Sequence, residues 1–201
     1  MKYKRTPEEQ RSIIIKGTRH LVAVGGMSNF SFPKLMSETG INAPAVYELY
    51  KNKEDLLTSC YMEIDSEIAL LLERALKRVP PHRDQVEAID DYCWTLWVTY
   101  WNYLMKDSER TLFYWRFYHS KYYTNELLQT RRRNFKAFLS FVQELDNRFH
   151  VSEKNDRQVL VGNLIDGTMS GAIKVIRGMY QNDDITVGTI LTPMLFRIVL
   201  R

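Results

Sequence analysis

The sequence predicts an all-α protein, and three observations support that prediction. Apolar residues recur at the 3.6-residue helical period through almost every segment of the 201-residue chain. Cap residues stand where these segments begin, and Gly or Pro stands where they end. No Asn-Gly or Asp-Gly hairpin lies between alternating runs, since Asp166-Gly167 falls inside a helical pattern. We expect about nine helices, arranged as a small N-terminal three-helix domain over residues 1–52 and a larger helical bundle over residues 53–201.

The first helix is expected from about Pro7 to Val24. Thr6 and Glu9 have the spacing of a capping box, and Pro7 stands at the first helical position, where its missing N–H costs nothing. Gly25-Gly26 then interrupts the periodic pattern. These signals define both ends of the helix.

Two short helices follow, over residues 32–39 and 43–49. Ser31 is the expected cap of the first and Asn42 of the second. Gly40 can adopt the left-handed backbone conformation needed in the turn between them. A glycine-containing turn of three or four residues between two short helices is the helix-turn-helix arrangement, whose second helix lies in the major groove of DNA.

This predicted hairpin has a buried side and an exposed side. Ile41 can plug the turn, while Leu35, Val46 and Leu49 can pack on the first helix. The exposed side of the second helix holds Ala43, Pro44, Tyr47 and Glu48. Its small leading residues would let the backbone approach DNA closely. Direct base readout would then fall on Asn42, Tyr47, Glu48 and apolar contact by Ala43, Pro44 and Ala45 with thymine methyl groups.

The remaining helices belong to the predicted bundle. Asn52 and Asp55 cap a long helix that Pro80-Pro81 ends. Further helices are expected over residues 84–105, 109–118, 125–149, 152–180 and 186–198, with Ser152 and Thr186 as the caps of the last two.

The sequence contains neither a recognisable catalytic motif nor a segment that could span a membrane. The histidines and cysteines are dispersed without metal-ligand spacing, and no Gly-rich phosphate loop or Gly-x-Ser-x-Gly elbow appears. The longest stretch without a charged residue or histidine, Tyr92 to Met105, is shorter than the roughly 20 apolar residues of a membrane span. We expect a cytoplasmic protein without enzymatic activity, cofactor or metal, with Cys60 and Cys93 as reduced core thiols.

The segment TGINAPAVYELYKNKEDLL, within residues 7–57, resembles the DNA-binding domain of the tetracycline-repressor (TetR) family of bacterial transcription regulators. The resemblance lies in Gly40-Ile41-Asn42, Val46-Tyr47, Tyr50 and Lys53-Glu54 followed by two leucines. It implies that Tyr47, Lys53 and Ser31 hold DNA phosphates. It also implies an all-helical domain that binds a small-molecule effector, and repressor polarity.

Two features leave a second interpretation open. Ala43 stands where the family often has a basic residue, and the net charge is only +4, with Lys and Arg outnumbering Asp and Glu by nine to six in residues 1–60. Phosphate binding depends on where a few charges lie rather than on their sum. The alternative is a TetR-like helical interaction or sensor protein with weak or no DNA binding.

A DNA-binding protein with so short a recognition helix is expected to act as a homodimer. One seven-residue helix reaches about three or four base edges, so two copies and a near-palindromic operator are needed for specificity. The expected dimer surface lies in residues 152–201, where Gly162, Gly167, Ser170 and Gly171 would let a partner helix approach closely.

The middle of the chain is rich in aromatic residues, which indicates either an effector pocket or an aromatic core. The predicted effector-binding residues are Trp94, Trp97, Trp101, Trp115, Tyr118 and Asp166. A pocket of this composition suits an aromatic or cationic ligand, through stacking and cation–π attraction. Helical spacing of aromatic residues is equally typical of burial alone.

Overall fold

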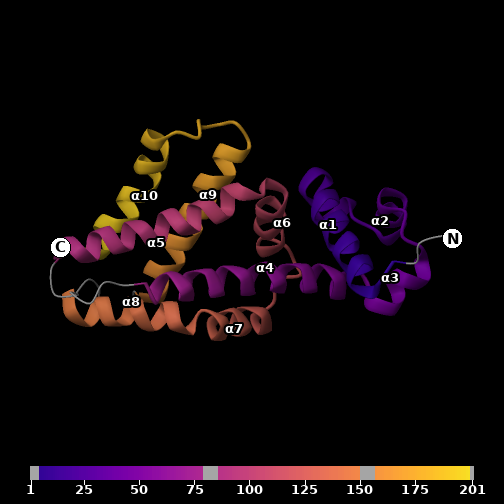
Figure 1. Cartoon of the computed structure of the whole chain (residues 1–201), viewed down its shortest axis with the longest axis horizontal. Coiled ribbons are helices and arrows are strands. Elements are labelled where there is room, and N and C mark those ends of the chain that lie inside the picture. The colour runs from indigo at the N-terminus through magenta and orange to yellow at the C-terminus, as the bar shows by residue number, and fades with distance from the viewer. Residues whose placement is uncertain (1–4, 79–85, 150–156, 200–201) are drawn as a thin grey trace. The chain divides into compact units, whose positions relative to one another are not determined.

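All regular structure in the described part of the chain is helical, which confirms the predicted fold class (Figure 1). The computed structural model describes residues 5–78, 86–149 and 157–199, with side chains described for 5–78, 93–144, 162 and 165–191. The helices are α1 (Pro7–Gly25), the 3₁₀ turn η1 (Met27–Asn29), α2 (Phe32–Thr39), α3 (Ala43–Leu49), α4 (Lys53–Leu76), α5 (Val86–Lys106), α6 (Ser108–Tyr118), α7 (Asn125–Asn134), α8 (Lys136–Phe149), α9 (Arg157–Ile176) and α10 (Asp184–Val199). No helix among the described residues is long and apolar enough to cross a membrane.

The helices pack as two compact units. The first unit comprises Met1–Asp65 together with Glu109–Leu128, and the second comprises Ser66–Ser108 together with Gln129–Arg201. In the first unit α1 packs against α2, α3 and η1, and in the second α5, α8, α9 and α10 pack against one another (Figure 1). The division between residues 52 and 53 stays a prediction.

The start of α1 has the predicted capping box. The backbone N–H of Thr6 donates to Glu9 Oε2 at 2.8 Å, and the backbone N–H of Glu9 donates to Thr6 Oγ1 at 3.2 Å. Two of the N–H groups that a helix N-terminus leaves without partners are thereby satisfied. The opposite end is defined by Gly26, whose φ of 81° breaks the helix.

The prediction of a single helix over residues 125–149 is wrong, because the chain forms two helices, α7 and α8, with Phe135 between them. Backbone hydrogen bonds continue across the break, from Phe135 N–H to Arg131 O at 2.9 Å and from Leu139 N–H to Phe135 O at 2.9 Å. The buried Phe135 ring packs in the second unit, whereas α7 has no buried residue. Without Pro or Gly at this point, the sequence carried none of the usual signals of a break.

The predicted ends of the last two helices also need correction. The helix expected to reach Tyr180 ends at Ile176, because Gly178 takes a φ of 70° and Met179 N–H bonds to Lys174 O, which is a Schellman termination. The expected cap Thr186 lies inside α10, and Asp183 caps that helix by accepting from the Thr186 N–H at 2.7 Å. Ser152, the other expected cap, lies outside the described residues.

Each unit has its own aromatic core. In the first, the Tyr61 ring stacks on Tyr114 and Phe117 with centroids 4.8 and 4.6 Å away, and the Tyr114 hydroxyl donates to the buried Asp65 carboxylate at 2.8 Å. In the second, Trp97 packs between Tyr100 and Phe138. Cys60 and Cys93 are buried free thiols, as predicted, and burial raises the pKa of Cys60 to about 12, which keeps it protonated.

Candidate nucleic-acid interface

The turn between α2 and α3 has the geometry that the sequence predicts. Gly40 adopts a φ of 66°, in the left-handed region that favours glycine, and its N–H donates to Met36 O at 2.9 Å. The Thr39 hydroxyl donates to Leu35 O at 2.7 Å and accepts from the Ile41 N–H at 3.3 Å. Ile41 itself is buried. These bonds hold the turn in one conformation.

The hairpin is seated on α1 through small and apolar residues. Leu35 and Val46 are fully buried, as expected, whereas Leu49 is half-buried. A Cβ added at Gly17 would collide with the Thr39 side-chain methyl and would lie 3.0 Å from Leu35 Cδ1. Only glycine therefore allows α2 to approach α1 this closely, which explains a glycine in the interior of a helix.

The predicted contact residues of α3 divide into an outer and an inner set. Pro44, Tyr47 and Glu48 are exposed, Ala43 is half-buried, and Ala45 is buried. The Tyr47 side chain is 57% exposed although its ring meets the buried Phe32 ring edge-on, at a centroid distance of 5.3 Å. Phe32 thus supports the exposed Tyr47 side chain, a role for which the sequence carried no signal.

Three predicted polar contact residues already make bonds within the chain. Asn42 Oδ1 accepts from the Ala45 N–H at 3.1 Å, and Ser31 Oγ accepts from the Lys34 N–H at 3.4 Å, so both residues cap their helices. Lys53 Nζ donates to Met27 O at 2.9 Å and Phe30 O at 2.7 Å. Lys53 therefore fixes the segment that leads into α2. Phosphate binding by these residues stays a prediction.

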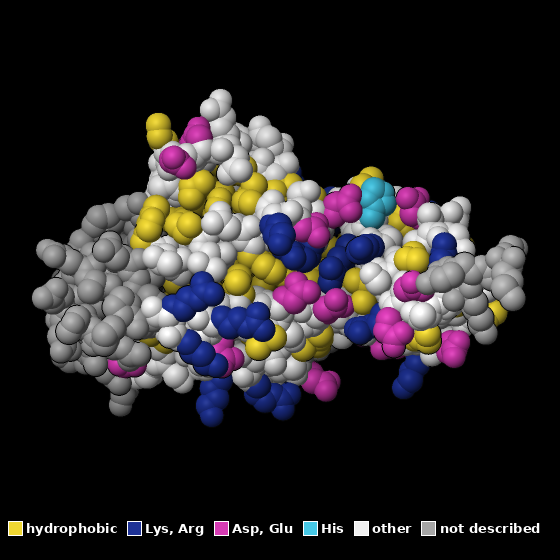
Figure 2. Space-filling view, in the orientation of Figure 1, with side chains coloured by type: hydrophobic (Ala, Val, Ile, Leu, Met, Phe, Trp, Pro, Cys, Tyr) yellow, Lys and Arg dark blue, Asp and Glu magenta, His cyan; other side chains and the backbone are white. Residues whose placement is uncertain are grey.

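Charges on the described part of the first unit are mixed. On the face shown in Figure 2, both acidic and basic side chains lie over α1–α3. Glu63 on α4 lies 3.8 Å from the Arg11 guanidinium and 3.7 Å from that of Arg19, both on α1. Among the described residues, no group of three or more potential metal ligands gathers. Burial is the main cause that raises the pKa of Tyr50, beside Arg11, above its usual value.

The predicted effector-binding residues are divided between the two units. Trp97 and Trp101 are buried in the second unit, and Trp94 on the same helix is 37% exposed. Asp166, on α9 of that unit, is half-buried. Trp115 and Tyr118 belong to the first unit, where Trp115 lies against the His119 ring at a centroid distance of 3.9 Å. Their role in ligand binding stays a prediction.

Comparisons with known proteins agree with this architecture. The family described as bacterial regulatory proteins, tetR family, matches residues 14–60, which span α1 to the start of α4. No match is found among curated proteins.

Solved structures share the fold over nearly the whole chain. A TetR family transcription regulator from Marinobacter aquaeolei VT8 is similar with a TM-score of 0.80 at 16% identity, covering 96% of each chain. A TetR-family regulator from Haemophilus influenzae RD gives a TM-score of 0.68 at 14% identity, covering 97% of this chain and 99% of the other.

A third neighbour was solved with a ligand. The transcriptional regulator FadR from Bacillus subtilis, in complex with stearoyl-CoA, gives a TM-score of 0.66 at 15% identity, covering 93% of this chain and 97% of the other. At these identities the likeness concerns the fold alone. The matched segment contains the helix-turn-helix and its exposed third helix, so the N-terminal part of this chain is similar to the bacterial regulatory proteins of the tetR family.

Proposed function

We propose that this protein is a ligand-responsive transcriptional repressor that binds a near-palindromic operator as a homodimer. The observation that carries the proposal is the exposed face of α3, where Pro44, Tyr47 and Glu48 project from a helix whose other side is buried. A helix held rigidly at its base and exposed along one face is what a major-groove reader requires.

The proposed contacts combine positioning and readout. Tyr47 and Ser31 would bind phosphates through their hydroxyl groups, and Lys53 would add charge near the start of α4. Glu48 and the amide of Asn42 would read base edges, and Ala43 and Pro44 would contact thymine methyl groups. A polar contact to a base edge discriminates by about 1–3 kcal/mol, so one α3 helix is a weak reader and two are needed.

The proposed dimer surface lies on α9 and α10, within residues 152–201. Of the small residues on α9, Gly171 packs inside the chain, because a Cβ there would lie 2.7 Å from Ile190 Cγ2 of α10. Gly162, Gly167 and Ser170 are half-exposed, and among the described residues an added Cβ at Gly162 would meet nothing within 4 Å. A partner helix can approach closely along such residues.

We expect light scattering at micromolar concentration to give twice the mass of one chain. Gly162→Leu should give a monomer with an unchanged circular dichroism spectrum, since leucine would block the partner helix and its Cβ meets no described atom of its own chain within 4 Å. Gly162→Ala, which adds only a methyl group, is the matched control and should remain dimeric. A monomeric wild-type protein would contradict the proposed dimer.

The proposed effector binds among the helices of the second unit, with Trp94, Trp97, Trp101 and Asp166 as candidate contacts. Trp115 and Tyr118 are kept as further candidates. The FadR structure with stearoyl-CoA supports a small-molecule ligand in this fold. An aromatic or cationic ligand fits the aromatic residues of this chain best. To reverse a 99:1 ratio between the DNA-binding state and the released state, the effector must bind the released state more tightly by about 5.5 kcal/mol. A buried site can supply such a difference in affinity.

The proposed response acts through α4, whose residues 53–65 belong to the first unit and 66–76 to the second. Effector binding would shift this helix and change the separation of the two α3 helices in the dimer. The state that no longer spans two half-sites would be favoured, and the operator would be released.

Selection of bound fragments from a random duplex pool tests the proposal. We expect enrichment of a near-palindromic sequence, with affinity that falls steeply as salt rises. The Tyr47→Phe/Lys53→Ala double variant should bind more weakly and lower the slope of log affinity against log salt by about one. Lys77→Ala, which removes a lysine paired with Glu73 on α4, is the charge-matched control and should bind as wild type. Equal binding by the double variant would contradict the assigned contacts.

A second candidate function is a TetR-like helical interaction or sensor protein with weak or no DNA binding. It is favoured by the polar groups of Ser31, Asn42 and Lys53, which already have partners within the chain, and by the mixed charges near α1–α3. This candidate predicts that little or no duplex is retained even at low salt. Enrichment of one sequence would exclude it.

A further inference from the structure

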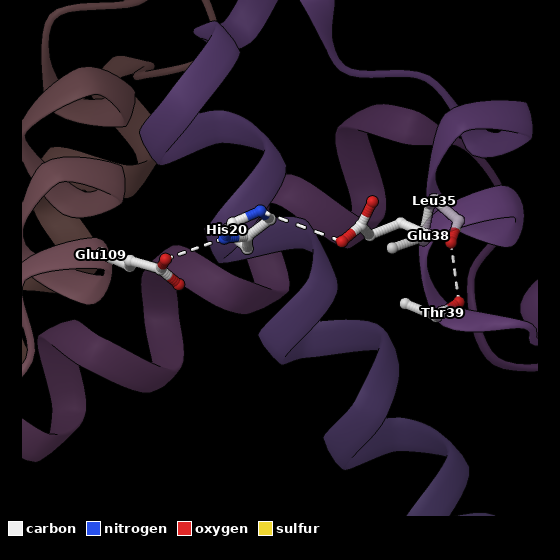
Figure 3. A network of polar contacts seen from close by, with 5 residues as sticks. All are labelled: His20, Leu35, Glu38, Thr39 and Glu109. Atoms are coloured by element: carbon white, nitrogen blue, oxygen red, sulfur yellow. Dashed lines mark hydrogen bonds and ion pairs between the residues drawn. The ribbon is translucent and has the colours of Figure 1, made fainter.

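A histidine on α1 joins three helices of the first unit (Figure 3). His20 Nδ1 lies 2.8 Å from Glu109 Oε1 on α6, and His20 Nε2 lies 3.9 Å from Glu38 Oε1 on α2. Glu38 is adjacent to Thr39, whose hydroxyl bond to Leu35 O belongs to the turn of the helix-turn-helix. The network therefore extends from α6 to the edge of the DNA-reading hairpin.

The helix α6 has further attachments in the same unit. Arg116 donates from its guanidinium to Val22 O at 2.6 Å, near the C-terminal end of α1, and the Tyr114 hydroxyl bonds to Asp65 on α4. The Arg116 contact keeps its charge at every accessible pH. His20 is thus an attachment between α6 and α1 whose charge changes near neutral pH.

The charged groups around His20 are mainly acidic. Glu109 faces it from α6 and Glu38 from α2. On α1 itself, Lys16 is one turn away and Arg19 is engaged by Glu63. The hydrogen bond to Glu109 is the largest cause that raises the pKa of His20 above 6.5, and Glu38 adds a smaller attraction.

The number of donors on the imidazole decides how many carboxylates it can bind. A neutral imidazole carries one N–H, so it donates to one of the two glutamates and presents a lone pair to the other. An imidazolium carries two N–H groups and one positive charge, so it attracts both. The bridge from α6 through α1 to α2 is therefore complete only when His20 is protonated.

We propose that His20 is a pH-sensitive latch that holds α6 and α2 together across α1. The latch is fully present below pH 6.5 and is lost as the pH rises through the raised pKa of the folded state. Because the His20 side chain is 42% exposed, solvent screens these ion pairs. We expect protonation of His20 to change the equilibrium between the latched and unlatched states by about two- to five-fold. This effect should become smaller as the salt concentration rises.

The first test follows the imidazole C2–H signal of His20 by NMR in the full-length protein, with His20→Gln to assign it. In the wild type its titration midpoint should lie above 6.5, and Glu109→Gln should move it down. Glu38→Gln should move it down by less. His119→Gln, which removes an exposed histidine directly after α6, is the control and should leave the midpoint unchanged. A wild-type midpoint at or below 6.5, or one insensitive to Glu109→Gln, would overturn the proposal.

The second test measures the free energy of unfolding in urea at pH 6 and pH 8.5. The latch should make the wild type more stable at pH 6. The unfolding constant at pH 8.5 divided by that at pH 6 should therefore be about two- to five-fold larger for the wild type than for His20→Gln. Equal ratios would overturn the latch.

The effect on DNA rests on the proposed function. With the selected duplex at constant salt, the wild type should change affinity between pH 6 and pH 8.5 by a similar factor, and His20→Gln should not. An NMR midpoint that behaves as expected, together with no duplex binding at any pH, would reject the proposed function and leave the latch standing. Duplex binding with the same pH dependence in both proteins would reject control of DNA binding by the latch.

Discussion

Tyr47→Glu is expected to reduce DNA affinity by about 100-fold or more while leaving the fold intact. The substitution removes a contact of about 1–3 kcal/mol and places a negative charge against the phosphates, and juxtaposed like charges cost several kcal/mol more. Because Tyr47 is 57% exposed, its replacement disturbs little packing beyond the edge contact with Phe32. Fluorescence anisotropy with the selected duplex measures the affinity, and circular dichroism checks the fold.

Two further variants distinguish the effect of the position on α3 from the effect of an added negative charge. Val24→Glu adds the same charge to the same unit at a residue of α1 that is 71% exposed, and it should lose much less affinity. Tyr47→Phe keeps the ring against Phe32 but removes the hydroxyl, so an intermediate loss is expected. If Tyr47→Glu bound DNA as tightly as Val24→Glu, α3 would not be the helix that enters the groove.

Trp97→Ala is expected to destabilise the protein by about 3–5 kcal/mol. The Trp97 side chain is 2% exposed and lies between Tyr100 and Phe138, and truncating a large buried side chain leaves a cavity that neighbours fill only in part. Urea unfolding followed by circular dichroism measures the free energy of unfolding. The spectroscopic signal then does not depend on the tryptophan that has been removed.

Trp94→Ala is the matched comparison on the same helix. With 37% of Trp94 exposed, its truncation removes less packing and should cost clearly less than the truncation of Trp97. This variant therefore suits a test of effector binding, because its fold is retained. Equal stability losses for the two variants would contradict the assignment of Trp97 to the core.

The local signals of the N-terminal domain were strong enough for its helices to be predicted from sequence. Capping side chains and a left-handed glycine act within a few residues of the backbone groups that they satisfy, so Thr6, Ser31, Gly40 and Asn42 could be recognised without coordinates. The same reasoning could have found the end of α9, since Gly178 stands directly after the periodic segment. The break at Phe135 had no such local signal.

The candidate site was only partly predictable. The exposed face of α3 follows from helical periodicity, because burial of Ala45 and Val46 turns Pro44, Tyr47 and Glu48 outward. The support of Tyr47 by Phe32 depends on how α2 and α3 cross. The two carbonyls that hold Lys53 are likewise brought near it by the fold of the preceding segment.

The sequence by itself determined the helical class and the helix-turn-helix, because these depend on periodicity and on caps that act over a few residues. Tertiary structure alone decided that α6 groups with the first unit and that His20 meets Glu109, a partner 89 residues away. Contacts at such separation depend on how whole helices pack against one another. That packing results from the combined burial of many side chains, which no local pattern records.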